Sequence, residues 1–260
     1  MDASFDTAAS NYDATFTNTI IGKLQRDLVY NQLSKVLENQ KPKTILEINC
    51  GTGEDAIWLA KQKFTVTATD ISEKMIAVSK SKKTLENVEF RQMDINSLNS
   101  YFSGKNFDLL FSNFGGLNCL SKTELQLFFK NATQLLTETG QIVLVIMPKN
   151  TLWEQFYFLA KGNFKNIFRR KKDSVIANVD GEKVVTHYYN PKETINLAAA
   201  FFNVKGVYPI GFFIPPSYLE PFLKNKSSLV SIISKFENKV KNNSFLSKYA
   251  DHYLIVFQKK

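Results

Sequence analysis

The chain has 260 residues, of which 44% are hydrophobic and 22% are charged. This composition is typical of a folded globular protein and excludes a disordered one. The longest apolar run, 142–147, is too short for a membrane span, and the acidic start MDASFDTAAS does not have the form of a secretory signal. Two cysteines, Cys50 and Cys119, cannot form a disulfide framework or a four-ligand zinc site. We therefore expect a cytoplasmic protein without a metal centre.

The charge is divided unevenly along the sequence. Residues 1–140 carry 15 Lys and Arg against 16 Asp and Glu, a net charge of −1, whereas residues 141–260 carry 18 against 8, a net charge of +10. The basic part could face an acidic small molecule, a phospholipid surface or RNA, or it could simply be a solvated surface.

The first 150 residues alternate between helix and strand patterns. Apolar residues at helical spacing predict a helix over 27–37, and a buried strand is expected over 44–49. A glycine turn over 50–53 separates this strand from a helix over 54–62. Further strands are predicted over 64–70, 88–94, 107–114 and 141–148, with helices over 73–82 and 122–136, the second ended by Gly140.

The pattern changes after residue 150. Residues 151–175 are aromatic and basic, with no predicted element. Beyond them we expect strands over 183–189, 204–214 and 252–258, a helix beginning at Pro191, and helical pieces over 218–223 and 229–240. Repeated strand–helix alternation indicates the α/β class, with a parallel sheet between helices. No linker is long enough to separate domains, so we expect a single domain over 1–260.

The informative segment is Glu47-Ile-Asn-Cys-Gly-Thr-Gly53, a strand end followed by a glycine turn and a helix start. In a doubly wound sheet, ligands bind at this edge. The segment does not fit the dinucleotide fingerprint, because Asn49 takes the first glycine position and the third glycine is absent. An acid at Glu47 would repel a phosphate and favour a ligand with a cationic part.

This segment resembles the first motif of class I S-adenosylmethionine-dependent methyltransferases, with Asn49 replacing the usual first glycine. Three further matches follow in order: Asp70 in TVTATDIS, Asp94 in FRQMDI, and the fourth-strand motif in FDLLFSNFGGLN. Later segments, THYYNPKETINLAAAFFNVKGVYPIG and HYLIVFQK, resemble the family's last helix and strands. The resemblance implies a Rossmann-like, seven-stranded, mostly parallel sheet with helices on both faces, the last strand antiparallel, and helical additions.

The resemblance also divides the expected single domain. It implies an N-terminal helical lid over 1–40, a cofactor-binding core over 41–150, a basic and aromatic insertion over 151–190, and a C-terminal part over 191–260 with helices between the last two strands. The lid carries Phe5-Asp6 and Tyr12-Asp13, and Tyr12 is expected to touch the methionine end of the cofactor.

The implied cofactor is S-adenosylmethionine. The main chain around Gly51 and Gly53, beside Asn49, would bind its carboxylate, and Glu47 would favour its ammonium. Asp70 would accept hydrogen bonds from the ribose hydroxyls. The remaining expected contacts, each of which could instead be core or surface, are Asp94, Ile71, Met75 and Ile95 around the adenine, and Ser112, Asn113 and Phe114 of the fourth-strand motif. Arg26 could reach the carboxylate, although a surface charge on its helix is the simpler expectation.

Two histidines are candidate general bases, His252 with its neighbour Asp251, and His187; either could equally be a packed or surface residue. The sequence lacks the Asn-Pro-Pro-Tyr, Asp-Pro-Pro-Tyr and Pro-Cys motifs of nucleic-acid methyltransferases, so nucleic acid is not the expected substrate. Aromatic residues in 149–189 and after Pro216 could roof an apolar pocket. The run 161–172 has six basic residues and no acid, and could contact an acidic substrate, an anionic membrane or nucleic acid, or be solvated.

Together these features predict methyl transfer from S-adenosylmethionine to a small molecule, on a hydroxyl of an apolar, aromatic or lipid-like compound. Two alternatives remain open from the sequence. One is an RNA methyltransferase that uses the basic C-terminal half, and the other is a cofactor-binding protein without catalytic activity.

Overall fold

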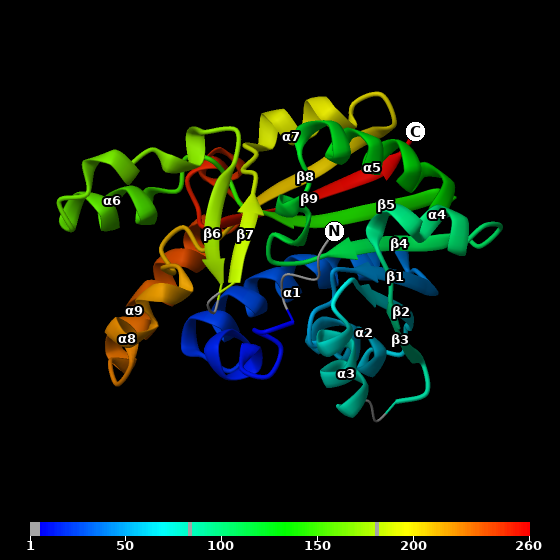
Figure 1. The fold of residues 1–260 in the computed structure, drawn as a ribbon, viewed down its shortest axis with the longest axis horizontal. Coiled ribbons are helices and arrows are strands. Elements are labelled where there is room, and N and C mark those ends of the chain that lie inside the picture. The colour runs from blue at the N-terminus through cyan, green and yellow to red at the C-terminus, as the bar shows by residue number, and fades with distance from the viewer. Residues whose placement is uncertain (1–5, 83–84, 180–181) are drawn as a thin grey trace.

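The computed structural model describes residues 6–82, 85–179 and 182–260, so Phe5 of the N-terminal motif lies outside the described residues. Seven strands form one sheet in the order β3-β2-β1-β4-β5-β9-β8 (Figure 1). Strand β9 is antiparallel to both neighbours, and the other pairings are parallel. The predicted fold class is confirmed. The strands are β1 Thr44–Ile48, β2 Thr65–Asp70, β3 Val88–Gln92, β4 Phe107–Ser112, β5 Leu136–Ile146, β8 Phe202–Ile210 and β9 His252–Lys259.

Helices cover both faces of the sheet (Figure 1). Successive strand residues point to opposite faces, so Ile45 packs in the core beneath one helical layer and Leu46 in the core beneath the other. The first layer contains α1 Ile20–Gln40, α2 Glu54–Lys61 and α3 Glu73–Ser81, and the second contains α4 Leu98–Tyr101, α5 Lys122–Leu135 and α7 Pro191–Ala198.

Additional elements gather at one end of the sheet, at the left of Figure 1. They are α6 Leu152–Ala160, the antiparallel hairpin of β6 Val175–Val179 and β7 Glu182–Thr186, and the helices α8 Glu220–Leu223 and α9 Ser227–Val240. No helix in the described part of the chain is long and apolar enough to cross a membrane.

Several sequence predictions about elements were wrong in detail. Helix α5 ends at Leu135 and β5 begins at Leu136, so Gly140 lies inside a strand and does not end the helix. A side chain at Gly140 would come within 2.8 Å of the Leu136 side chain, which explains why glycine suits this position. Residues 152–160, left without a predicted element, form α6. The first long helix begins at Ile20, where the Thr19 side chain accepts a hydrogen bond from the Gly22 N–H.

One carboxylate fixes the start of the sheet at the edge opposite the glycine turn. Asp108 Oδ2 accepts hydrogen bonds from the Lys43 N–H at 2.8 Å, the Thr44 N–H at 3.0 Å and the Thr44 hydroxyl at 3.1 Å. Partial burial acts to raise the pKa of Asp108, but these hydrogen bonds outweigh it and lower the pKa. Asp108 therefore joins the start of β1 to β4 most strongly when it is ionised.

We expect Asp108→Ala to lower the free energy of unfolding by about 1–2 kcal/mol at neutral pH, because several donors lose their acceptor. A lowered folded-state pKa stabilises the fold above the unfolded value of about 3.9, and this stabilisation is lost as the pH falls through the folded value. Urea denaturation of both proteins across this range should show a difference that is constant near neutrality and shrinks in acid. A difference that grows in acid would contradict the assignment.

Candidate functional site

The glycine turn after β1 is built from left-handed residues. Asn49, Gly51 and Gly53 have φ values of 58°, 52° and 78°, as expected for Asn and Gly. A side chain at Gly53 would come within 2.7 Å of Phe90, whereas one at Gly51 would meet no atom within 4 Å. The turn therefore packs tightly behind Gly53 and is open at Gly51.

The fourth-strand motif makes room for Asn49. A side chain at Gly116 would come within 2.6 Å of the Asn49 side chain. The asparagine that replaces the usual first glycine is therefore matched by a glycine opposite it. The Asn49 amide nitrogen is buried and has no hydrogen-bond partner.

Asp70 ties the turn to β2. Its Oδ2 accepts the Gly51 N–H at 2.8 Å and its Oδ1 accepts the Ser72 N–H at 2.9 Å. Burial raises the pKa of Asp70, although the hydrogen bonds from Ser72 and Gly51 oppose this. The parallel pairing of β1 with β2 brings their carboxyl ends to one edge, so the structure places these residues together as the sequence predicted.

A buried acidic group lies beneath the turn. Asp55, in the first turn of α2, accepts hydrogen bonds from Arg26 Nε at 2.9 Å, the Tyr30 hydroxyl at 2.7 Å and Asn113 Nδ2 at 2.9 Å. Glu47 is 1% exposed, and its Oε2 has no hydrogen-bond partner. Burial, reinforced by the charges of Asp55 and Asp70, raises the pKa of Glu47 well above its usual value, while Arg26 opposes the shift.

The expectation of a surface position for Arg26 was wrong. Arg26 is 8% exposed and forms a buried ion pair with Asp55. Its guanidinium lies 5.8 Å from the centre of the Phe16 ring and 5.2 Å from that of the Phe114 ring. Its Nη1 has no hydrogen-bond partner. Helical periodicity shows which residues share a face of α1, but it does not show whether that face is buried in the tertiary structure. The burial of Arg26 could therefore not be predicted from the sequence.

Unpartnered polar atoms gather at the carboxyl ends of β1 and β4. Buried polar groups in folded proteins are normally hydrogen-bonded, so a cluster of exceptions indicates a place for a ligand or water. Phe114, with a left-handed φ of 43°, follows β4 directly. Four of the ten buried side-chain atoms without a hydrogen-bond partner in the described residues belong to this group, namely Arg26 Nη1, Glu47 Oε2, Asn49 Nδ2 and Ser112 Oγ.

The N-terminal segment lies across this edge. The Asp6 carboxylate accepts a hydrogen bond from the Ser72 hydroxyl at 2.5 Å, and that of Asp13 accepts one from the Thr52 hydroxyl at 2.7 Å. Ala8 and Ala9 pack against Met75 of α3, with Tyr12 beside them. Burial raises the pKa of Tyr12 to about 12, with Arg26 opposing the shift and Asp55 and Asp70 adding to it. The Tyr12 hydroxyl is therefore neutral.

The residues expected around adenine are more dispersed. Asp94 is half-buried and caps the short helix Ile95–Ser97, accepting the Asn96 N–H at 2.8 Å. Ile95 packs against the core beneath the second helical layer, whereas Met75 packs with the N-terminal segment. Ile71 is half-buried after β2.

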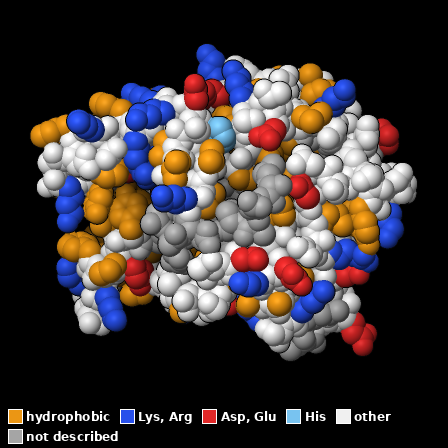
Figure 2. Space-filling model, viewed as in Figure 1, with side chains coloured by type: hydrophobic (Ala, Val, Ile, Leu, Met, Phe, Trp, Pro, Cys, Tyr) orange, Lys and Arg blue, Asp and Glu red, His pale blue; other side chains and the backbone are white. Residues whose placement is uncertain are grey.

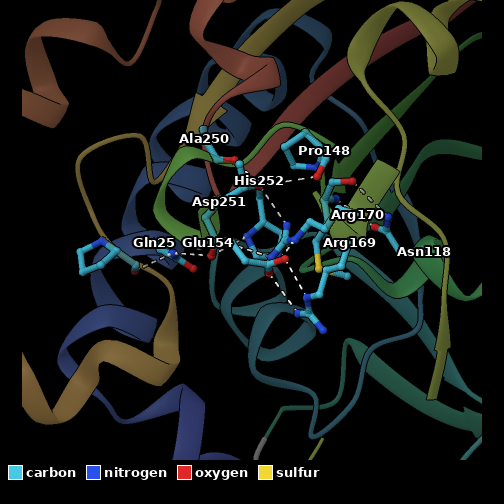
Figure 3. Close-up of polar contacts among 12 residues, drawn as sticks. Gln25, Asn118, Pro148, Glu154, Arg169, Arg170, Ala250, Asp251 and His252 are labelled. Carbon is cyan, nitrogen blue, oxygen red and sulfur yellow. Dashed lines mark hydrogen bonds and ion pairs between the residues drawn. The ribbon is translucent and has the colours of Figure 1, made fainter. Parts of the chain in front are cut away.

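His252 begins β9 and lies beside Phe114, with ring centres 5.7 Å apart. It is 8% exposed, and its Nδ1 is 3.3 Å from Asp251 Oδ2 (Figure 3). Asp251 also accepts a hydrogen bond from Gln25 Nε2 at 3.0 Å and lies 3.7 Å from Arg170 Nη2. Burial acts to raise the pKa of Asp251, but His252, Arg170 and Gln25 together lower it.

Arg170 joins this group to the 151–190 segment. Glu154 of α6 accepts hydrogen bonds from Arg169 Nε and Arg170 Nε, each at 2.8 Å (Figure 3). Arg170 is 6% exposed and its guanidinium lies 4.7 Å from the centre of the Tyr188 ring. The interpretation of 161–172 as a uniformly solvated basic run is therefore wrong for Arg170.

His187 follows β7 and lies in a different set of contacts. Its Nδ1 donates to the Asp173 carbonyl at 2.7 Å, and its backbone N–H donates to the Asn118 carbonyl at 2.7 Å. Among the described residues, no contact joins its ring to His252 or to the glycine turn. No cluster of three or more His, Cys, Asp or Glu side chains in the described ranges is placed to hold a metal ion.

The sequence analysis did not identify three residues that form buried hydrogen bonds around the site, namely Asp55, Tyr30 and Gln25. Asp55 had a detectable signal, because an acid two residues after Gly53 falls in the first helical turn next to the expected ligand. Tyr30 and Gln25 had none. Their importance depends on how α1 packs against α2 and against the 211–216 segment.

Comparisons with known proteins agree with this geometry. Residues 45–140 match the methyltransferase domain family. A Geobacillus sp. protein with a provisional methyltransferase name is 36% identical over 107 residues, covering 40% of this chain and 42% of that protein. A malonyl-[acyl-carrier protein] O-methyltransferase of Priestia megaterium is 36% identical over 141 residues, covering 52% and 49%. The chain thus matches about half the length of these relatives.

A solved structure shares the fold over nearly the whole chain. It is a Listeria monocytogenes protein provisionally described as an S-adenosylmethionine-dependent methyltransferase, with a TM-score of 0.61 and 18% identity, covering 92% of this chain and 99% of that one. Residues 45–140 thus resemble a methyltransferase domain, and the chain as a whole shares the fold of this solved structure.

We expect Asp55→Ala to lower the free energy of unfolding by about 3–5 kcal/mol, because it leaves the buried Arg26 charge unpaired. Arg26→Met combined with Asp55→Leu should recover much of this loss, since neither charge then remains. Urea denaturation of the single and double variants checks the pair. Equal losses in Asp55→Ala and in the double variant would show that the ion pair does not account for the effect.

Proposed function

We propose that this chain binds S-adenosylmethionine at the glycine turn and transfers its methyl group to a small-molecule acceptor. The observation that carries this proposal is the buried Glu47 carboxylate, whose Oε2 has no hydrogen-bond partner and which lies within the electrostatic influence of Asp70, at the same edge of the sheet as the glycine turn. The family match at 45–140 supports the same conclusion.

The residues present fit this cofactor by charge. Three carboxylates, Glu47, Asp55 and Asp70, surround the site, and Arg26 is the buried cation near them. Burial disfavours the ionised form of Glu47 when no ligand is bound, and a ligand with an ammonium group would favour that form. Arg26 Nη1 and the N–H groups of the open turn at Gly51 are donors suited to a carboxylate.

The other predicted cofactor contacts are Asp70, at the end of β2, and the residues expected around the adenine. Each Asp70 oxygen accepts one backbone N–H and has a further lone pair for a ribose hydroxyl. Asp94, Ile71, Met75 and Ile95 are proposed around the adenine. We assign a covering role to residues 6–17, because Asp6 and Asp13 attach that segment to Ser72 and Thr52. Within it, Ala8, Ala9 and Tyr12 pack against Met75. We also propose the division made from the sequence, a single domain with a lid, a cofactor-binding core, an insertion and a C-terminal part.

When bound, S-adenosylmethionine supplies a methyl group already activated by its sulfonium. The chain therefore mainly has to orient the acceptor and exclude water. Phe114, held between Phe16 and His252 at ring distances of 4.9 and 5.7 Å, is placed to form an apolar wall. His252, oriented by Asp251, is the group we assign to accept a proton from the acceptor.

The acceptor we favour is a hydroxyl or another oxygen of an apolar, aromatic or lipid-like compound. Aromatic side chains of α6 and of the 212–218 segment contact each other, and Gly211, just before that segment, accepts the Asp251 N–H. These aromatic residues support an apolar acceptor. An oxygen acceptor is also what the name of the Priestia megaterium relative specifies. His187 is the weaker candidate base, because its described contacts are with Asp173 and Asn118 and none of them joins its ring to His252 or to the glycine turn.

We expect Asp70→Ala to weaken S-adenosylmethionine binding at least about tenfold, a loss of roughly 1.4 kcal/mol, because two charge-assisted hydrogen bonds are removed. Titration calorimetry measures this directly. Asp27→Ala, which removes an exposed acid from α1, is the matched control and should leave the affinity unchanged. Unchanged affinity in Asp70→Ala would rule out the proposed cofactor orientation.

We expect His252→Ala to lower turnover by about a hundredfold or more, as for the loss of a general base, while cofactor affinity stays within about twofold. Single-turnover kinetics and calorimetry on the same preparation separate these two effects. A matching loss of cofactor affinity would instead assign His252 to cofactor binding.

The acceptor is best sought directly. Labelled S-adenosylmethionine, the protein and a metabolite extract should give a labelled organic-soluble product that the Asp70→Ala protein does not form. A labelled RNA from a parallel incubation would favour the RNA alternative, for which the charge of +10 in 141–260 is the supporting observation. Cofactor binding with no labelled product from either pool would favour a non-catalytic protein.

A further inference from the structure

One end of the molecule exposes an unusual number of large apolar side chains. Fourteen such side chains are exposed in the described part of the chain, and nine of them lie within 156–168 and 218–245. Six of the nine are phenylalanines with exposed fractions from 48% to 69%. They are Phe156, Phe164, Phe168, Phe222, Phe236 and Phe245. We refer to residues 152–173 and 217–249 as the aromatic–basic end.

The two segments of this end lie against each other. Tyr157 of α6 and Tyr218 have ring centres 5.0 Å apart, and Trp153 Nε1 donates to the Phe212 carbonyl at 2.9 Å. Figure 2 shows hydrophobic side chains gathered at the left of the view, with Lys and Arg around them and a hollow between the two projecting parts. The exposed aromatic residues therefore form one region of the surface.

The same end is strongly cationic. It contains twelve Lys and Arg and four acids, and three of the four acids are occupied inside the fold. Glu154 binds Arg169 and Arg170, Glu220 accepts the Ile20 and Ile21 N–H groups, and Glu237 accepts three N–H groups of 212–214. Eight of the lysines are exposed, namely Lys161, Lys165, Lys171, Lys172, Lys224, Lys226, Lys235 and Lys239.

Lysines and aromatic rings are interleaved over this surface. Lys171 Nζ lies 4.4 Å from the centre of the Phe168 ring, Lys226 Nζ lies 3.6 Å from that of Phe222, and Lys239 Nζ lies 5.5 Å from that of Phe236. Each pair places a cation beside an exposed apolar ring. A lipid headgroup phosphate and the acyl boundary beneath it have the complementary order, charge outside and apolar inside.

We propose that the aromatic–basic end docks on an anionic membrane surface. The lysines contact acidic headgroups and the phenylalanines enter the interface below them. Single-stranded RNA could use the lysines and stack bases on the rings. The aliphatic side chains of Leu159 and Ile232, each 51% exposed at this end, have no stacking role and suit the acyl boundary of a membrane. The proposal does not depend on the identity of the methyl acceptor, but Arg170, which bonds to Glu154 of α6, lies 3.7 Å from Asp251, so the docked end adjoins the His252 group.

Vesicle co-sedimentation of the full chain tests this proposal. The probes are vesicles of phosphatidylcholine alone and of phosphatidylcholine mixed with phosphatidylglycerol. We expect binding to the anionic vesicles only, reduced by added salt. Phe164→Ala with Phe168→Ala, and separately Lys165→Glu with Lys172→Glu, should each lower partitioning at least about tenfold.

The control variant carries Leu127→Ala and Lys130→Glu on α5, at the other end of the molecule. It alters one exposed apolar residue and one exposed lysine. We expect it to change partitioning less than about twofold. Titration of each variant with S-adenosylmethionine checks that it is folded and keeps this test separate from the proposed function. Absence of binding to anionic vesicles overturns the proposal. A second result would also overturn it: vesicle binding falls in the Lys165→Glu with Lys172→Glu variant but not in the phenylalanine variant, and binding of single-stranded RNA falls in the same lysine variant. That result would identify a surface for polyanions.

Discussion

The carboxylate of Asp55 is the point on which the candidate site depends. It holds Arg26 and Tyr30 of α1 and Asn113 after β4, and is itself fixed in the first turn of α2. One side chain thus joins a helix, the helix that follows the glycine turn, and the end of a neighbouring strand. Because Arg26, Asp55 and Asn113 are buried, removing either charge of the Arg26–Asp55 pair would leave the other charge buried and unpaired.

The charges around Asp55 are not fully matched, and the proposed binding site rests on this imbalance. Glu47, Asp55 and Asp70 are buried close to a single arginine, and Glu47 keeps an oxygen without a partner. A fold normally avoids such a group because burying an unpaired carboxylate is unfavourable. A ligand that is cationic on one side and anionic on the other would remove the cost on both Glu47 and Arg26.

Phe114 connects this edge to the part of the molecule that differs most from a minimal α/β fold. Its ring contacts Phe16 and His252, and His252 leads through Asp251 and Arg170 to Glu154 of α6. The basic and aromatic additions are therefore continuous with the site through buried polar contacts, which include the Arg170–Glu154 ion pair. Their outer surface remains apolar and cationic because three of their four acids, Glu154, Glu220 and Glu237, are occupied by contacts within the fold.

The sequence by itself determined the alternation of strands and helices, the glycine turn and the position of Asp70 at the end of a strand, because hydrophobic periodicity and glycine placement are local properties of the chain. The order of the strands depends on their pairing in the sheet and was seen only in the structure. The sequence could not determine that Arg26 is buried or that Tyr30 and Gln25 reach the site, since these depend on the packing angle of α1. Gly140 was misread because a glycine that ends a helix and one that gives room to Leu136 look alike in sequence. The tertiary structure brings residues more than two hundred positions apart into contact, as Gln25 with Asp251. Only these contacts decide which buried polar groups are paired and which lack a partner within the protein.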